Sequence, residues 1–261
     1  MMSAFRELIK YRELLYMITW RDIHIKYKQS VMGFMWAILM PMLIIAVGVL
    51  VRYGIAKFSG HPLEITQIVT VCVKAIPWAF FISSINFATN CLVGNVNLVT
   101  KIYFPKEIFP LSAVLSQLFD FIIASGALIV FLTVARVGWS VQFVWIFPLL
   151  LILILLAMAL GIFLSAANLF LRDVKYLVNV IINFAIFFTP VFYDSHIAGK
   201  WETLLLLNPV APILEGLNSC IVLHQTPKVF WVLYSSIVAV LGFYLAMIFF
   251  KNLEPKFAEN I

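Results

Sequence analysis

The sequence is short of charge. Only 11% of its 261 residues are Asp, Glu, Lys or Arg, whereas about 25% is usual for a soluble domain. The apolar fraction is 64%, against about 45–50% in soluble proteins. A water-soluble core of this length cannot bury so much apolar surface. The composition therefore predicts an all-α integral membrane protein that has lipid as its main solvent.

Motifs that carry chemistry are also absent. The sequence holds no G-x-x-x-x-G-K-[ST] phosphate loop, no H-E-x-x-H, no C-x-x-C and no G-x-S-x-G. Its three cysteines, Cys72, Cys91 and Cys220, are far apart and lack the spacing of metal ligands. We therefore expect a chain that is not an enzyme, with no catalytic residue, no metal and no cofactor of its own.

The net charge of +6 at first suggests a nucleic-acid partner. The basic residues, however, lie in short segments between apolar runs. This is the pattern of charges that face a membrane surface. We expect no nucleic-acid binding.

Six apolar stretches approach or exceed the length of about 20 residues that a membrane-spanning helix needs. They are 31–51, 68–93, 108–135, 141–169, 176–192 and 230–250. The fifth is short and is closed by Pro190. The pattern predicts six transmembrane helices in a single domain, 1–261.

A seventh apolar stretch, 203–223, is interrupted by Pro209 and Pro212. Two prolines would break a spanning helix there and leave backbone groups that lipid cannot satisfy. Short re-entrant or interfacial helices fit the segment 197–225 better than another span.

The distribution of Lys and Arg predicts the orientation. If the N-terminus is cytoplasmic, the inner segments 1–30, 94–107, 170–175 and 251–261 hold twelve basic residues, and the outer segments hold five. Both termini are then cytoplasmic. In 1–30 the apolar positions Phe5, Leu8, Ile9, Leu15, Ile18 and Trp20 are spaced to favour one side, which predicts an amphipathic helix at the membrane interface.

Two ionisable residues fall within predicted spans, and such residues are functional candidates by default. Lys74 lies near the outer end of its span, where its side chain can snorkel to the surface. Asp120 lies nearer the middle and can accept hydrogen bonds from neighbouring helices. One acid is not a proton relay, so we expect a structural role for Asp120.

Aromatic residues are plentiful, at 24 Phe, 7 Trp and 9 Tyr. A route for sugars needs flat apolar faces and few charges, and Trp36, Trp78, Phe184 and Phe188 are the candidates to line it. Phe184 and Phe188 share one helix face at i, i+4 spacing. The alternative is that these rings pack inside the protein or face lipid.

The inner loop 94–107 combines aromatic residues with charges, which suggests a docking surface for a soluble partner. The alternative is a loop that packs on the protein's own inner face. The candidates for docking within it are Lys101, Tyr103, Phe104, Lys106 and Glu107.

Several segments together resemble the ABC type-2 permeases that export polysaccharides, and the O-antigen exporters most of all. The two longest are RDIHIKYKQSVMGFMWAILMPML (21–43) and NVNLVTKIYFPKEIFPLSAVLSQLFDF (95–121). NLFLRDVKYLV (168–178), FFTPVFY (187–193) and LLNPVAPILEGLN (206–218) continue the match in order.

The resemblance implies a homodimer with a channel between two copies, in the bacterial inner membrane. Two separate ATPase subunits would bind ATP and Mg²⁺, and the substrate would be a polysaccharide on a polyprenyl-diphosphate carrier. The loop 94–107 would be a coupling helix, with Arg172 and Asp173 in a second cytoplasmic contact. The segment 197–225 would form outer gate helices, with Asn208, Pro209 and Glu215 as gate candidates.

Two alternatives stay open at this point. Capsule and teichoic-acid exporters are near relatives of the same family. A membrane-embedded glycosyl- or acyltransferase would also handle polyprenyl lipids, but it needs a cluster of acids or histidines. Asp22, Glu107, Asp120 and Asp173 are instead widely separated in the sequence.

Overall fold

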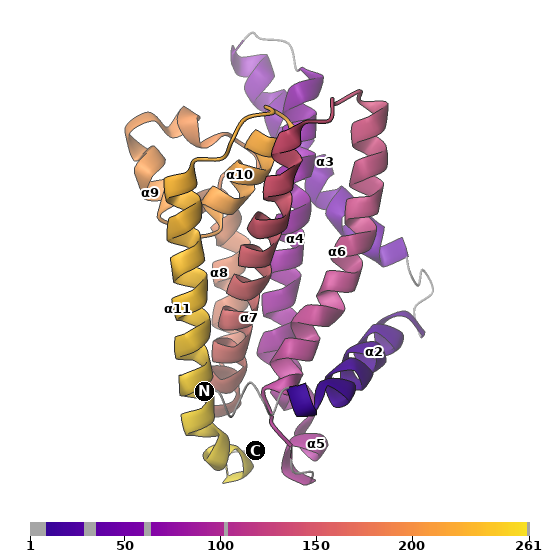
Figure 1. Ribbon diagram of the computed structural model, residues 1–261, viewed down its shortest axis with the longest axis vertical. Helices are drawn as coiled ribbons and strands as arrows, with labels where there is room; N and C mark the ends of the chain where they lie inside the picture. The colour runs from indigo at the N-terminus through magenta and orange to yellow at the C-terminus, as the bar shows by residue number, and fades with distance from the viewer. Residues whose placement is uncertain (1–8, 29–34, 60–63, 102–103, 260–261) are drawn as a thin grey trace.

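The computed structural model describes residues 9–28, 35–59, 64–101 and 104–259, and in these every regular element is helical (Figure 1). The α-helices are α2 (Arg12–Lys28), α3 (Trp36–Ser59), α4 (Ile65–Gly94), α5 (Val96–Lys101), α6 (Ile108–Val134), α7 (Ile146–Phe170), α8 (Val174–Phe188), α9 (Glu202–Leu206), α10 (Ala211–Ile221) and α11 (Val229–Leu253). Short 3₁₀ helices are η2 (Val141–Trp145), η3 (Ser195–Trp201) and η4 (Glu254–Glu259). The predicted all-α class is confirmed for this part of the chain.

Among the described residues, four helical stretches are long and apolar enough to cross a membrane. They are Ile65–Gly94, Ile108–Val134, Val141–Phe170 and Val229–Phe257. Counting the bent pair formed by α9 and α10 as one broken span gives a fifth. The predicted spans 31–51 and 176–192 overlap α3 and α8, whose described apolar stretches are Met42–Gly54 and Val174–Phe188 and fall short of a full span. The protein is thus a multi-pass membrane protein, and the six-span count stays a prediction.

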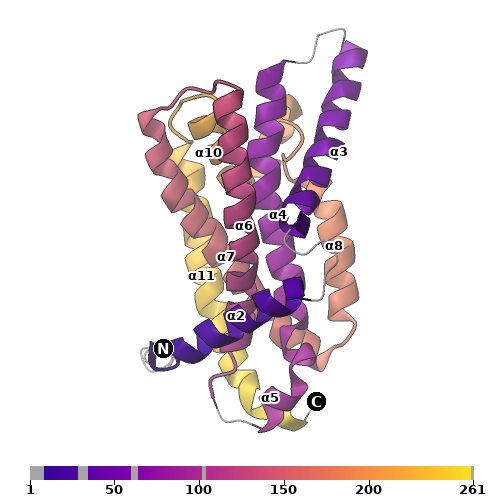
Figure 2. The same cartoon turned by 90° about the vertical axis from the view of Figure 1, so that its right-hand side faces the viewer.

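Helix α4 lies at the centre of the bundle, packed against α3, α6, α7 and α10 (Figures 1 and 2). It continues without a break through Pro77. Gly161 on α7 permits the close approach of α7 to α4, because a Cβ at this position would lie 2.8 Å from the Cβ of Ala88 on α4. Small residues at such contacts are the usual means by which membrane helices pack tightly.

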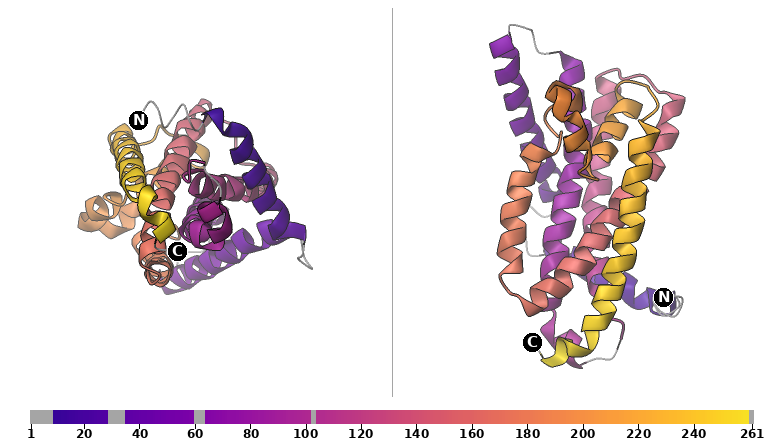
Figure 3. Two further views of the ribbon diagram at one scale, coloured as in Figure 1. Left: turned by 90° about the horizontal axis from the view of Figure 1, so that it is seen from below. Right: turned by 90° about the vertical axis from the view of Figure 1, so that its left-hand side faces the viewer.

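Helix α2 lies across the bundle near the end that carries both chain termini, and it contacts α6 (Figures 2 and 3). We had predicted that its apolar residues share one side of the helix, and they do not. Ile18 is buried against the core, whereas Trp20 is 48% exposed. Ile9, just before α2, is also exposed, and Phe5 and Leu8 lie outside the described residues. The segment is therefore apolar on both its inner and its outer side.

The opposite end of the bundle is covered by the segment between α8 and α11. Here α9 and α10 are bent by 111° relative to each other. The turn between them contains Pro209, and Pro212 stands in the first turn of α10, where a missing N–H is tolerated. The prolines thus produce the break that the sequence predicted.

Candidate functional site

A buried ion cluster lies where α4 meets the segment between α8 and α11. The ammonium group of Lys74 is 3.0 Å from Asp194 Oδ1 and 2.9 Å from Glu215 Oε1, and it also donates to the carbonyl oxygen of Tyr193 at 3.1 Å. The Lys74 side chain is 0% exposed. The prediction that Lys74 snorkels to the surface is therefore wrong: two carboxylates satisfy its charge inside the protein.

Two further groups complete the cluster. Arg52 on α3 donates from Nη2 to Asp194 Oδ2 at 2.9 Å, and the backbone N–H of Ser195 donates to Glu215 Oε1 at 2.9 Å. The formal charges of the two cations and two carboxylates cancel, as a buried site requires. The cluster therefore connects α3 and α4 to the residues just before the predicted gate segment, 197–225, and to Glu215 within it.

The electrostatics of the cluster are visible in the pKa of Asp194. Burial by itself raises this pKa, but the charges and hydrogen bonds of Lys74 and Arg52 outweigh that effect. The net result is a pKa below the ordinary value, so the carboxylate stays ionised at neutral pH. Sequence reasoning missed both Asp194 and Arg52. The available signal was Lys74 itself, because a cation within a span needs an acidic partner.

Glu215 is one of the three gate candidates, and the other two, Asn208 and Pro209, lie in the turn before α10. The Asn208 side chain donates to Thr189 Oγ1 at 2.9 Å and accepts from the backbone N–H of Val210 at 3.2 Å. Asn208 therefore connects the α9–α10 turn to the end of α8 by hydrogen bonds. Pro209 follows it and lines a separate cavity between α7 and α11. The structure thus places Asn208, Pro209 and Glu215 in one segment, with Glu215 in the ion cluster.

A second polar contact joins α2 to α6. The Lys26 ammonium and the Tyr27 hydroxyl both donate to the carboxylate of Asp120, and Lys26 also donates to Gln117 Oε1 at 3.1 Å. The prediction that Asp120 accepts hydrogen bonds from a neighbouring helix is confirmed. Burial and the nearby Asp120 carboxylate raise the pKa of Tyr27, so its hydroxyl remains a proton donor.

The described coupling candidates of the inner loop lie in or next to α5, at the end of the bundle that carries the termini (Figure 2). Lys101 is exposed at the end of α5, and Tyr103 lies outside the described residues. Phe104 is only 7% exposed, because its ring packs on Phe109 at a centroid distance of 5.4 Å. The loop thus directs this ring into the chain's own core, as in the alternative interpretation, and not outward for insertion into a partner.

The rest of this loop is held by the C-terminal residues. The backbone N–H of Lys106 donates to Glu254 Oε1 at 3.3 Å, and its ammonium lies 5.8 Å from the centre of the Phe257 ring. Glu107 is 1% exposed and lies 3.8 Å from Lys251. The second predicted contact, Arg172 and Asp173, is exposed in the turn between α7 and α8.

The four candidates for a substrate path are not brought together within one chain. Trp78 is 2% exposed and packs on Phe81 inside the chain, so it faces no open channel of this chain. Trp36 lines a cavity of about 320 Å³ together with Lys26 and Asp120. Phe184 and Phe188 are 61% and 69% exposed on the outer face of α8.

No group of three or more His, Cys, Asp or Glu side chains in the described part of the chain is placed to hold a metal ion. The structure instead offers several apolar helices, a neutral ion cluster at one end and a charged, aromatic loop at the other. These features define a polytopic helical membrane protein.

The chain belongs to the ABC-2 type transporter family, whose pattern matches residues 13–222. It is 28% identical over 270 residues to the O-antigen export system permease protein RfbA of Myxococcus xanthus, covering 100% of both chains. Proteins of the same name from Klebsiella pneumoniae are 28% identical over 255 residues and 27% identical over 252 residues, each covering 95% of this chain and 94% of the relative. A permease of this family is a transport subunit without catalytic activity of its own.

Proposed function

We propose that this chain is the permease of an ATP-driven exporter that moves a polyprenyl-diphosphate-linked polysaccharide of the O-antigen type from the cytoplasm across the bacterial inner membrane. The observation that carries the proposal is the similarity to O-antigen export permeases over the whole length of both chains. The glycosyl- or acyltransferase alternative finds no support, because the acids considered for it, Asp22, Glu107, Asp120 and Asp173, form no group of three in the described part of the chain. Asp120 is occupied by Lys26 and Tyr27, and Glu107 lies beside Lys251.

In this proposal the chain crosses the membrane six times with both termini in the cytoplasm, and α9 and α10 are gate helices at the outer face. A separate ATPase subunit binds ATP and Mg²⁺. It docks on the end of the bundle that holds α5 and the α7–α8 turn, through Lys101, Arg172 and Asp173. The excess of Lys and Arg in the segments at this end supports the orientation.

The proposed transporter contains two copies of the permease and two ATPase subunits. The outer face of α8 supports pairing of the permeases, since Val180, Ile181, Phe184, Phe187 and Phe188 are all more than half exposed. An apolar face of this kind can meet lipid or a second copy of the chain. In the dimer it would place Phe184 and Phe188 beside the channel between the copies.

The experiment that tests this function has two parts. The purified permease should not hydrolyse ATP, and co-purification with its ATPase subunit should give a complex that does. Deletion of the gene for this chain should abolish surface polysaccharide, with lipid-linked polymer retained inside the cell. ATP hydrolysis by the isolated chain, or normal surface polysaccharide in the deletion strain, would overturn the proposal.

A further inference from the structure

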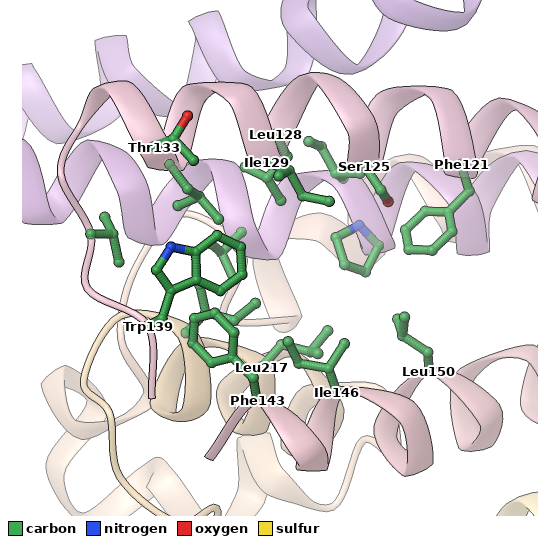
Figure 4. A pocket seen from close by; sticks show the side chains of 16 residues that line it. Phe121, Ser125, Leu128, Ile129, Thr133, Trp139, Phe143, Ile146, Leu150 and Leu217 are labelled. Carbon is green, nitrogen blue, oxygen red and sulfur yellow. The ribbon is translucent and has the colours of Figure 1, made fainter. Parts of the chain in front are cut away.

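An apolar cavity of about 270 Å³ lies between α4, α6, α7 and α10, toward the end of the bundle opposite the chain termini. Its lining comes from helices that are far apart in the sequence, and Figure 4 shows the side chains of α6 facing those of η2 and α7 across it. The sixteen lining residues include no charged side chain. The cavity is separate from the ion cluster, because Lys74, Asp194 and Glu215 do not line it.

The chemistry of the lining selects an apolar occupant. Ser125 and Thr133 carry the only hydroxyl groups among the lining residues, and Thr133 already donates to the carbonyl oxygen of Val130 at 2.7 Å. A sugar would lose hydrogen bonds to water here without replacing them. Cavities of this kind exclude water and accept hydrocarbon groups.

The cavity adjoins the lipid-facing surface of the bundle. Ile129 lines the cavity and is 52% exposed. Trp139 lines it as well, is 74% exposed, and packs on Phe143 with their ring centroids 5.4 Å apart (Figure 4). Val130 continues the exposed apolar surface on α6. A hydrocarbon chain in the bilayer can therefore reach the cavity without crossing a polar barrier.

The volume limits the size of the occupant. Pockets that enclose a whole drug-sized ligand usually measure about 300–1,000 Å³, so this cavity accommodates a segment of a chain while the remainder stays in the bilayer. An acyl chain that enters from the side fits this condition. Filling the space would also restore dispersion contacts that the lining side chains otherwise lack.

Two basic side chains lie beside lining residues of the cavity: Arg136 is next to Val137 in the sequence, and His224 contacts Phe143. Arg136 follows the end of α6 by two residues, is exposed, and pairs with no carboxylate in the part of the chain that the structure describes. His224 stacks on the Phe143 ring at 6.3 Å. Arg136 and His224 are also the described non-glycine residues with positive φ, 57° and 54°, a conformation that is costly and often serves a function.

We propose that this cavity binds one acyl chain of a phospholipid from the adjacent leaflet, with the lipid phosphate held at the rim by Arg136. The lipid would fill the gap between α6 and α7 and stabilise their spacing. The proposal does not depend on which polysaccharide is exported, or on the ATPase partner.

The test uses the full-length permease in nanodiscs that contain a phosphatidylethanolamine with a photoactivatable group on its acyl chain. After illumination, mass spectrometry should find adducts on lining residues such as Leu150 and Leu217. Ile146→Trp fills the cavity from α7 and should reduce these adducts by about tenfold, the effect of losing about 1.4 kcal/mol of binding free energy. Phe147→Trp is the matched control, because Phe147 is the next residue, is 81% exposed and does not line the cavity.

A second pair of variants tests the rim. Arg136→Gln should reduce the adducts by about threefold, as expected for one exposed charge pair. Lys200→Gln, which removes an exposed cation elsewhere at this end, should not reduce them.

If Ile146→Trp fails to fold, Ser125→Met is used in its place, because it fills the same cavity from α6. Equal labelling in the cavity-filling variant and its control, or stronger labelling of the cavity by a photoactivatable polyprenyl phosphate, would overturn the proposal.

Discussion

The two ends of the bundle handle charge in different ways. At the end away from the termini, Lys74 is completely buried and lies within 3.0 Å of two carboxylates. At the end that carries the termini, the Lys251 side chain is 34% exposed and lies 3.8 Å from Glu107, and Lys101 is exposed at the end of α5. One end thus contains a buried, charge-neutral ion cluster, and the other combines the partly exposed Lys251 with the exposed Lys101.

This difference separates internal stability from partner binding. Breaking a buried ion pair costs about 3–5 kcal/mol, whereas an exposed pair contributes about 0–1 kcal/mol. The buried cluster therefore fixes the segment between α8 and α11 to the spanning helices, while the exposed charges contribute little to folding. If the proposed function is correct, the accessible end meets the ATPase and the other end forms the gate.

The largest expected effect follows from removing the central cation of the buried cluster. Lys74→Met leaves Asp194 and Glu215 without their shared partner, so we expect a loss of about 3–5 kcal/mol in the free energy of unfolding. Thermal unfolding of the purified protein in detergent measures it. Lys57→Met, an exposed cation in the last turn of α3, is the control and should have little effect. Equal melting temperatures for the two variants would show that the cluster is not a stabilising contact.

The next prediction concerns the ion pair between Lys74 and Glu215 when both charges are removed. Lys74→Met/Glu215→Leu no longer contains an unpaired Glu215, and Asp194 keeps Arg52 as its partner. Because replacing a whole buried pair by apolar groups is often close to neutral, we expect this variant to lose about 1–3 kcal/mol, less than Lys74→Met alone. The same unfolding measurement gives the coupling energy. A double variant less stable than the single one would contradict direct pairing of Lys74 with Glu215.

Composition and the length of the apolar runs were enough to predict the helical class and most of the helices. The bounds of α6, Ile108–Val134, match the predicted 108–135 almost residue for residue, because charged or polar residues mark both ends. The prolines likewise indicated the break between α9 and α10. These features depend on local sequence and on the requirement that lipid leaves no backbone group unsatisfied.

The contacts of individual side chains could not be predicted in the same way. Lys74 looked like a snorkelling residue because Asp194, its partner, is 120 residues away in the sequence. Phe104 looked like a residue exposed for docking, yet it packs on Phe109 in the next helix. Trp78 looked like a channel residue and is buried instead. Burial of this kind depends on how helices cross, which periodicity does not determine.

A smaller effect is expected at the contact between α2 and α6. Asp120→Asn removes the charge that accepts hydrogen bonds from Lys26 and Tyr27. Since the Lys26 side chain is 33% exposed, we expect a loss of about 1–2 kcal/mol, toward the low end for hydrogen bonds to charged groups. Amide hydrogen exchange should become faster in α2 but not in α11. Uniformly faster exchange in all helices would indicate general destabilisation and not release of α2.

Acid should weaken the buried cluster through Asp194. The pKa of this carboxyl is lowered in the folded protein, so its contribution to stability is present above its unfolded pKa of about 4 and is lost as the pH falls through the lower, folded value. Wild-type protein should lose thermal stability more steeply below about pH 4 than Asp194→Asn does. Asp173→Asn, at an exposed site, should retain the steep dependence. Parallel curves for wild type and Asp194→Asn would show that Asp194 has no altered pKa.

The smallest effect on stability is expected at Lys101, and this prediction tests the accessible end directly. Because its side chain is exposed at the end of α5, Lys101→Ala should change the free energy of unfolding by less than about 0.5 kcal/mol. If Lys101 lies at the rim of the proposed ATPase interface, the dissociation constant of that complex should rise by up to about fivefold, equivalent to at most about 1 kcal/mol. The rise should shrink at high salt, where exposed charges are screened. Titration of the labelled ATPase subunit onto the permease in nanodiscs measures this dissociation constant at two salt concentrations.

Phe104→Ala should give the opposite pattern, a clear loss of stability, because the Phe104 ring belongs to the core. A large loss of stability in Lys101→Ala would remove the distinction between the two ends.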